Sequence, residues 1–167
     1  MKKSYILATF VLIFLAFTSC YGCASSNSAE NETTEKLDEE MKSNSQSQNT
    51  NLKMSIGGTE VQVAWEENES VTALKNLAME KNPLEIQMSM YGGFEQVGRI
   101  GNSLPRNDSE ITTRPGDIVL YLGNQIVLFY GSNSWNYTRL GKIMDKSASE
   151  MHGLLSNGDV VIKIWAE

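Results

Sequence analysis

Residues 115–130 read PGDIVLYLGNQIVLFY, and this stretch decides the fold class. Two runs in it, Ile118–Leu122 and Ile126–Tyr130, are apolar on both faces and rich in β-branched and aromatic residues, as in strands covered on both sides. Gly123-Asn124 separates the runs, and Pro115-Gly116-Asp117 precedes the first; both are turn signals. The stretch therefore predicts two central, buried β-strands joined by a turn.

Further short strands are predicted on either side of this pair. Their residues alternate between apolar and polar, which is typical of strands with one buried face. Glycine pairs or Asn-Gly follow or precede several of them and predict tight turns. The predicted flanking strands are Leu52–Ile56, Thr59–Trp65, Leu84–Met90, Phe94–Ile100 and Asp159–Trp165.

Two short helices interrupt the strands. We expect Ser70 to cap the first, whose apolar residues between 71 and 78 share one face, and Pro83 to end it. Ser147 and Glu150 form a capping box that opens the second. Many short strands with a helix near each end predict a mainly β protein, a closed or nearly closed β-barrel capped by two helices.

The first 20 residues resemble an export signal. Lys2 and Lys3 precede Tyr5–Phe17, an apolar run too short to span a bilayer comfortably and suited to a secretory signal. The run ends at Thr18-Ser19-Cys20, which resembles a bacterial lipobox. We therefore expect a signal peptide over residues 1–19, lipidation of Cys20, and a lipoprotein of the cell membrane that faces away from the cytoplasm. Cys23 is a weaker candidate, and ordinary secretion is the alternative.

Residues 20–51 are rich in Ser, Asn, Gln and Glu and have almost nothing to bury. Such a composition predicts a disordered, acidic and polar tether, with a reach of roughly 30 Å, before a folded domain over residues 52–167. The chain has a net charge of −6, and its bases are scattered. An acidic chain of this kind repels phosphate backbones, so we do not expect it to bind nucleic acid. We expect contact with the membrane only through the lipid anchor.

Few residues of the folded region point to metal or covalent chemistry. Both cysteines, Cys20 and Cys23, precede it, so no cysteine can serve it as a nucleophile, ligand or disulfide partner. His152 is the one histidine and is expected on a helix face. We therefore predict neither a metal site nor a cofactor.

Four strings of this chain resemble the small bacterial cyclophilin-like domains. They are Tyr91–Glu95 (YGGFE), Gly98–Ile100 (GRI), Thr112–Tyr121 (TTRPGDIVLY) and Phe129–Ile143 (FYGSNSWNYTRLGKI). The resemblance covers roughly residues 52–166, and its last two strings are the most specific. It implies a closed eight-stranded barrel, with one helix after the second strand and another before the last.

The resemblance also raises the question of catalysis, because true cyclophilins are peptidyl-prolyl isomerases that use an arginine aimed at the prolyl amide. Arg99 lies at about that place and is the catalytic candidate. However, Gly98 precedes it, so the phenylalanine-histidine-arginine run of true cyclophilins is missing, and no glutamine follows at the expected spacing. The small family keeps the fold without an assigned activity, and a fold does not fix a function.

A group of aromatic and arginine side chains near predicted turns suggests binding instead. Aromatic rings beside guanidinium groups suit an extended peptide or a carboxylate. In the structural alternative, the rings pack the barrel ends, and Arg139 pairs with Asp145 or Glu150. The candidate ligand-binding residues are Tyr91, Phe94, Arg99, Trp135, Tyr137 and Arg139.

We therefore expect a membrane-anchored binding module that takes a peptide or small molecule at the mouth of the barrel. The alternative enzymatic function is a weak or divergent prolyl isomerase that depends on Arg99. A third possibility is an accessory domain that only holds a partner, which predicts an exposed apolar patch instead of a pocket.

Overall fold

The computed structural model describes residues 51–167. The expected signal peptide, the lipidated Cys20 and the tether up to residue 50 lie outside the described residues. Within the described part of the chain, neither helix has the length and apolar character needed to cross a membrane.

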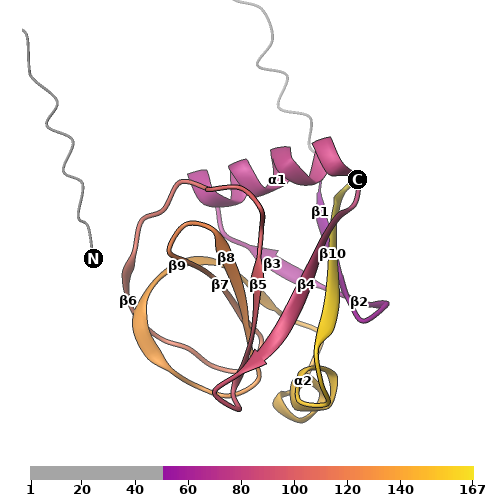
Figure 1. Cartoon of the computed structure of the whole chain (residues 1–167), viewed down its shortest axis with the longest axis vertical. Helices are drawn as coiled ribbons and strands as arrows, with labels where there is room; N and C mark the ends of the chain where they lie inside the picture. The colour runs from indigo at the N-terminus through magenta and orange to yellow at the C-terminus, as the bar shows by residue number, and fades with distance from the viewer. Residues whose placement is uncertain (1–50) are drawn as a thin grey trace, which may run out of the picture. The chain divides into compact units, whose positions relative to one another are not determined.

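The described residues form a mainly β domain with ten strand segments and two helices (Figure 1). All neighbouring strands pair antiparallel, in the order β2-β1-β10-β4-β5-β8-β7-β9-β3, and β6 pairs with β9 outside this path. The strands are β1 (Leu52–Ile56), β2 (Thr59–Val61), β3 (Val63–Trp65), β4 (Leu84–Tyr91), β5 (Glu95–Arg99), β6 (Ser109–Thr112), β7 (Asp117–Tyr121), β8 (Gln125–Phe129), β9 (Ser134–Ile143) and β10 (Val160–Ala166).

One segment of chain brings the two edges of the sheet together. β2 pairs with β1 at one edge, while β3, which follows after Gln62, pairs with β9 at the other. At this junction the Gln62 N–H donates to Asp145 Oδ1 at 2.9 Å, and the Met144 N–H donates to the Gln62 carbonyl at 2.8 Å. The sheet is therefore a nearly closed barrel, as predicted. It has ten segments instead of eight because the chain breaks its pairing at Gln62 and because β6 adds to β9.

The two central strands are buried on both faces, which confirms the prediction from residues 115–130. Along β7, Ile118 and Leu120 point into the main core with the helices, whereas Val119 belongs to a second apolar cluster on the outer face. All three side chains are fully buried. In β8, Val127 likewise belongs to the outer cluster while its neighbours face inward. This outer cluster positions the candidate site.

Helix α1 (Glu69–Lys81) lies across one end of the barrel and α2 (Ala148–Leu155) across the other (Figure 1). The predicted Ser147–Glu150 capping box is present at α2. The prediction that Ser70 caps α1 is wrong: Asn68 is the cap, and its side chain accepts from the Val71 N–H at 2.9 Å. Ser70 is buried and donates to the Pro105 carbonyl at 2.6 Å, so its hydroxyl ties the helix to the 101–108 loop instead.

Candidate ligand-binding site

A second, smaller apolar cluster covers the outer face of the barrel. In a strand, successive side chains point to opposite faces, so the residues of β5, β7 and β8 that do not enter the main core meet on the other side. β6 and β9 contribute the rest of the cluster through their own side chains. The buried members are Ile111, Val119, Val127, Phe129 and Tyr137, with Phe94, Val97 and Tyr121 packed against them.

A cavity of about 350 Å³ opens beside this cluster. It is lined from β4, β5, β7, β8 and β9, and therefore lies on the outer face of the sheet and not at the barrel mouth, where we expected the ligand. The volume is within the range of small-molecule sites. The lining residues are Tyr91, Glu95, Val97, Tyr121, Gln125, Val127, Asn133, Trp135 and Tyr137.

The acid in this cavity is Glu95, which is only 6% exposed although it lies at the start of a strand. Its Oε2 atom is buried and has no hydrogen-bond partner among the described residues. Because burial disfavours the charged form, the pKa of the Glu95 carboxyl is raised from 4.5 to about 7. The carboxyl therefore exchanges its proton near neutral pH, in a residue that lines the cavity.

Four aromatic side chains line the same cavity as the acid. Tyr121 and Tyr137 meet edge to face with ring centroids 5.9 Å apart. The Tyr137 hydroxyl accepts a hydrogen bond from Asn133 Nδ2 at 3.0 Å, and burial raises the pKa of this phenol, so it stays neutral at physiological pH. Trp135 and Tyr91 form an open rim, since they are 57% and 68% exposed. Exposed aromatic rings beside a cavity are suited to contact with a ligand.

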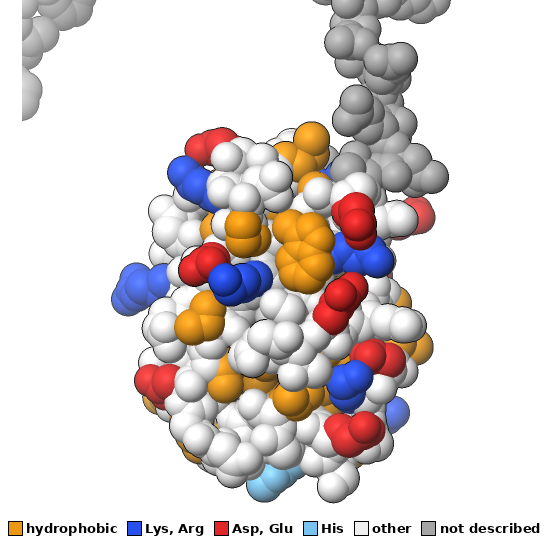
Figure 2. Space-filling view, turned by 90° about the vertical axis from the view of Figure 1, so that its right-hand side faces the viewer, with side chains coloured by type: hydrophobic (Ala, Val, Ile, Leu, Met, Phe, Trp, Pro, Cys, Tyr) orange, Lys and Arg blue, Asp and Glu red, His pale blue; other side chains and the backbone are white. Residues whose placement is uncertain are grey.

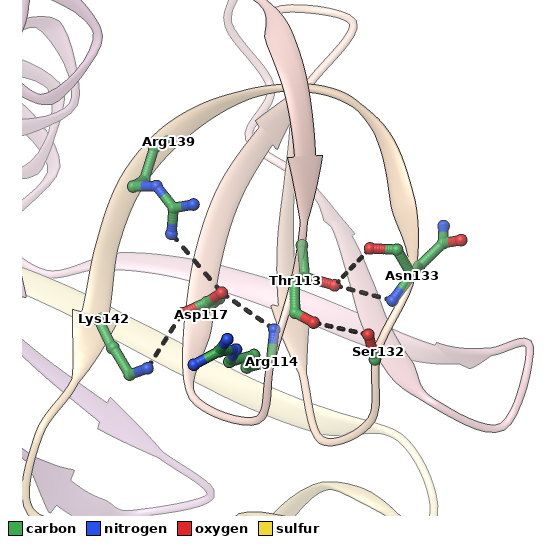
Figure 3. A network of polar contacts seen from close by, with 7 residues as sticks. All are labelled: Thr113, Arg114, Asp117, Ser132, Asn133, Arg139 and Lys142. Carbon is green, nitrogen blue, oxygen red and sulfur yellow. Dashed lines mark hydrogen bonds and ion pairs between the residues drawn. The ribbon is translucent and has the colours of Figure 1, made fainter.

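A polar network fixes the loop that carries Asn133 (Figure 3). The fully buried Thr113 hydroxyl donates to the Asn133 carbonyl at 3.0 Å and accepts from the Asn133 N–H at 2.9 Å. Ser132 Oγ donates to the Thr113 carbonyl at 2.7 Å. The loop before β9 is thus held against the segment before β7. This holds Asn133, and through it the Tyr137 hydroxyl, in place.

The same segment is anchored by Asp117, a buried carboxylate (Figure 3). Its Oδ2 accepts from the Arg114 N–H at 3.0 Å and lies 3.5 Å from Arg139 Nη1, and its Oδ1 lies 3.6 Å from Lys142 Nζ. The expected pairing of Arg139 with Asp145 or Glu150 is therefore wrong. The guanidinium of Arg139 supports the β7–β9 contact and does not line the cavity.

The structure separates the predicted site residues into three groups. Tyr91, Trp135 and Tyr137 line the cavity. Phe94 lies behind it, stacked on Phe129 with centroids 6.5 Å apart. Arg99, like Arg139, is outside the lining. Arg99 is exposed and lies on the same strand as Glu95, four residues further along β5.

The cavity is also lined by Glu95, Tyr121 and Asn133, none of which was predicted from the sequence as a site residue. A signal for Glu95 was present, because strand alternation places it on the same face of β5 as Val97 and it follows Phe94 directly. A glutamate that shares a strand face with apolar residues is a candidate for a buried acid. Asn133 gave no such signal, because its role depends on a turn contact with Thr113, 20 residues away in sequence.

Metal ligands do not gather among residues 51–167: no three His, Cys, Asp or Glu side chains come together there. His152 packs edge to face against Tyr130 with centroids 5.7 Å apart. Its Nδ1 also lies 3.0 Å from Ser156 Oγ. These contacts indicate that His152, in the last turn of α2, has a structural role.

A nearly closed barrel with a helix at each end agrees with the architecture that the resemblance to cyclophilin-like domains implies. The cyclophilin-like family model matches residues 54–164, and the chain belongs to this family. Among solved structures, the chain is similar in fold to the protein in "Structure of McbB in complex with tryptophan". The likeness has a TM-score of 0.51 at 9% identity and covers 69% of this chain and 44% of that one.

The chain thus spans less than half the length of the McbB chain it matches, and at 9% identity the likeness concerns the fold. A comparison with curated proteins finds no match.

Proposed function

We propose that this domain is a binding module that holds a small ligand, or one side chain of a peptide, in the outer-face cavity. The observation that carries the proposal is the buried Glu95, which lines a cavity rimmed by the exposed Trp135 and Tyr91 and whose Oε2 atom has no hydrogen-bond partner among the described residues. A buried polar atom without a partner costs about 1–3 kcal/mol, which a ligand that supplies the partner can recover. Sites of this kind combine apolar walls with a few polar groups that orient the ligand.

The volume of about 350 Å³ limits what can be enclosed. It suits a small molecule or a single side chain, with the rest of a peptide lying over the rim. McbB is described in complex with tryptophan, so a protein that contains this fold holds a small molecule of such a size. This supports a small-ligand function for the present domain without naming the ligand.

The test is an NMR titration of the purified full chain against a mixed library of small molecules and short peptides. Ligands of the cavity should shift the indole N–H signal of Trp135 and lose at least tenfold in affinity in Trp135→Ala. Met79→Ala is the control, because Met79 is also an exposed apolar side chain but lies on α1, away from the cavity. If no compound shifts the cavity signals, or if Trp135→Ala binds every hit normally, the proposal fails.

Prolyl isomerisation is the alternative activity, and Arg99 is the side chain it requires. Arg99 is exposed four residues beyond Glu95, so a peptide that occupies the cavity could extend toward it. Exchange spectroscopy of a short X-Pro peptide distinguishes the two functions, because the uncatalysed reaction takes tens of seconds. Faster exchange that is lost in Arg99→Ala indicates an isomerase. Shifted signals without faster exchange indicate a binding module.

We further propose that the domain is anchored outside the cytoplasm through a lipid on Cys20. The support is the sequence Thr18-Ser19-Cys20 directly after an apolar run. A diacyl chain would hold firmly, because each buried methylene contributes about 0.8 kcal/mol. Metabolic labelling with a fatty-acid analogue should be lost in Cys20→Ala and kept in Cys23→Ala. Equal labelling of both variants would contradict this anchor.

A further inference from the structure

We propose that the outer-face cavity recognises an organic cation, such as a quaternary ammonium or a protonated amine, through the Glu95 carboxylate and the rings around it. This inference rests on the proposed function of the same cavity and names the chemical class of its ligand. Four observations carry it: the burial of the acid, its missing partner, the absence of a base in the lining and the aromatic character of the wall.

The acid is built into the fold and not left at its surface. Glu95 is only 6% exposed, and β5 holds it through ladder pairing with Tyr91 on β4 and Phe129 on β8. Its Oε2 atom has no hydrogen-bond partner among residues 51–167. Acids at such depth are usually paired, so a partner is expected to arrive with the ligand.

The described cavity wall offers no positive charge to Glu95. No lysine, arginine or histidine is among the residues that line it. The titratable groups that share the cavity are the phenols of Tyr91 on β4, Tyr121 on β7 and Tyr137 on β9, while β8 contributes Gln125 and Val127. On β5 itself, the nearest base along the strand is the exposed Arg99. An anionic ligand would therefore find no positive charge in this lining and would be repelled by the ionised Glu95, which favours a cation over an anion.

The wall suits a cation in particular. Tyr91, Tyr121, Trp135 and Tyr137 line the cavity around the acid. Aromatic faces attract cations electrostatically, and several rings around one site are a recurring way to hold an ammonium group. A neutral ligand could also accept a hydrogen bond from the protonated acid. The two classes differ in how pH affects them, because a cation needs the ionised carboxylate whereas a neutral acceptor needs the protonated one.

The test compares choline with 3,3-dimethylbutan-1-ol, which has the same shape without the charge. NMR titration of the purified full chain at pH 5.5 and pH 8 gives both affinities. The charge of choline does not titrate, so its affinity should follow ionisation of Glu95, whose pKa is about 7, and rise about thirtyfold between these pH values. At pH 8 the neutral alcohol should bind at least tenfold more weakly than choline.

The variant Glu95→Gln keeps the shape of the side chain without the charge. It should lose at least tenfold in choline affinity at pH 8, and the pH dependence should disappear. Glu85→Gln is the matched control, because Glu85 lies on β4 outside the cavity and pairs with Lys163 at 2.6 Å. In the parent chain, choline should also lower the pKa of Glu95, measured by carbon NMR of its carboxyl group.

Two results would overturn the inference. One is that the neutral alcohol binds at pH 8 as tightly as choline or more tightly. The cavity would then bind uncharged ligands, and the proposed function would still hold. The other is no shift of the cavity signals by choline at pH 8. The proposed function itself fails only if the wider library also finds no ligand, so the two failures can be told apart.

Discussion

At the scale of single residues, Glu95 couples the stability of the fold to pH. Its pKa is raised by burial from 4.5 to about 7 in the folded chain. Between these values the folded state holds a proton that the unfolded state has released. The contribution of Glu95 to the free energy of unfolding is therefore complete below pH 4.5. It is lost as pH rises from 4.5 through 7, and the total loss is up to roughly 3 kcal/mol.

The variant Glu95→Gln removes this loss because it cannot ionise. We expect it to unfold at higher denaturant concentration than the parent chain at pH 8, by up to roughly 3 kcal/mol, with little difference at pH 4. Urea denaturation at both pH values measures this. Glu85→Gln, at an exposed site, should show no such pH-dependent gain. A variant less stable than the parent at pH 8 would mean that the ionised Glu95 is stabilised by a partner.

The hydroxyl of Thr113 makes a contribution to stability that a single substitution can measure. This hydroxyl both donates to and accepts from the Asn133 backbone inside the fold. Thr113→Val keeps the shape but leaves these groups without that partner, so we expect a loss of about 1–3 kcal/mol in unfolding free energy. The matched control is Thr112→Val, because the Thr112 hydroxyl meets Ser134 Oγ at an exposed position. Equal losses in both variants would contradict a special role for the buried hydroxyl.

At the scale of elements, Gly98 sets how closely β5 approaches β4. A Cβ at this position would lie 2.3 Å from Met88 Sδ, 2.6 Å from Ile86 Cγ2 and 2.9 Å from the Gln87 carbonyl oxygen. Because the carbonyl belongs to the strand backbone, the strands would have to move apart. The same glycine interrupts the phenylalanine-histidine-arginine run of true cyclophilins, so this departure follows from how the two strands pack here.

Gly98→Ala should therefore cost about 1–3 kcal/mol or more of unfolding free energy, measured by chemical denaturation, because overpacking forces backbone shifts. Gly153→Ala is the contrasting variant. Nothing lies within 4 Å of a Cβ at Gly153, which is inside α2, so alanine should stabilise by up to about 1 kcal/mol. Stabilisation by Gly98→Ala would mean that β4 and β5 are further apart than described.

Much of the element scale could be predicted from local patterns. The buried strand pair between residues 115 and 130 follows from two apolar runs separated by a turn, and the α2 capping box follows from Ser147 and Glu150. The prediction that Ser70 caps α1 failed because contacts distant in sequence decide which residue is the cap. Asn68 can accept from the helix and also donate to the Arg139 carbonyl at 2.9 Å, whereas Ser70 bonds the Pro105 carbonyl. Local spacing cannot distinguish these two candidates.

At the scale of the whole molecule, closure of the barrel depends on contacts far apart in sequence. The strand over residues 59–65 was predicted as one element, but it changes partner at Gln62, from β1 to β9. The cavity has the same origin, since Tyr91, Glu95, Tyr121 and Trp135 come from four strands that only the sheet order brings together. The aromatic residues of the rim could be predicted as site residues because they lie near predicted turns. Glu95 could not, because only the folded sheet places it in the same cavity as these rings.

The two arginines illustrate the same limit. Arg139 is near the aromatic residues in sequence, yet it ion-pairs with the buried Asp117. Arg99 is near Glu95 along β5 but lies outside the cavity lining. The predicted site therefore shifts from guanidinium groups, which would take a carboxylate, to a carboxyl group, which takes a cation or a hydrogen-bonding partner.

The pKa of the Glu95 carboxyl decides whether the cavity holds a buried acid, and NMR titration of its side-chain carbon measures this pKa in the full chain without ligand. We expect a midpoint of about 7, because the carboxyl is buried and its Oε2 atom has no hydrogen-bond partner among the described residues. Glu85, exposed on β4, serves as the reference in the same spectra. A midpoint of 4.5 for Glu95 would mean that its carboxylate is solvated or paired, and the cavity would then hold no unpartnered acid for a ligand to bind.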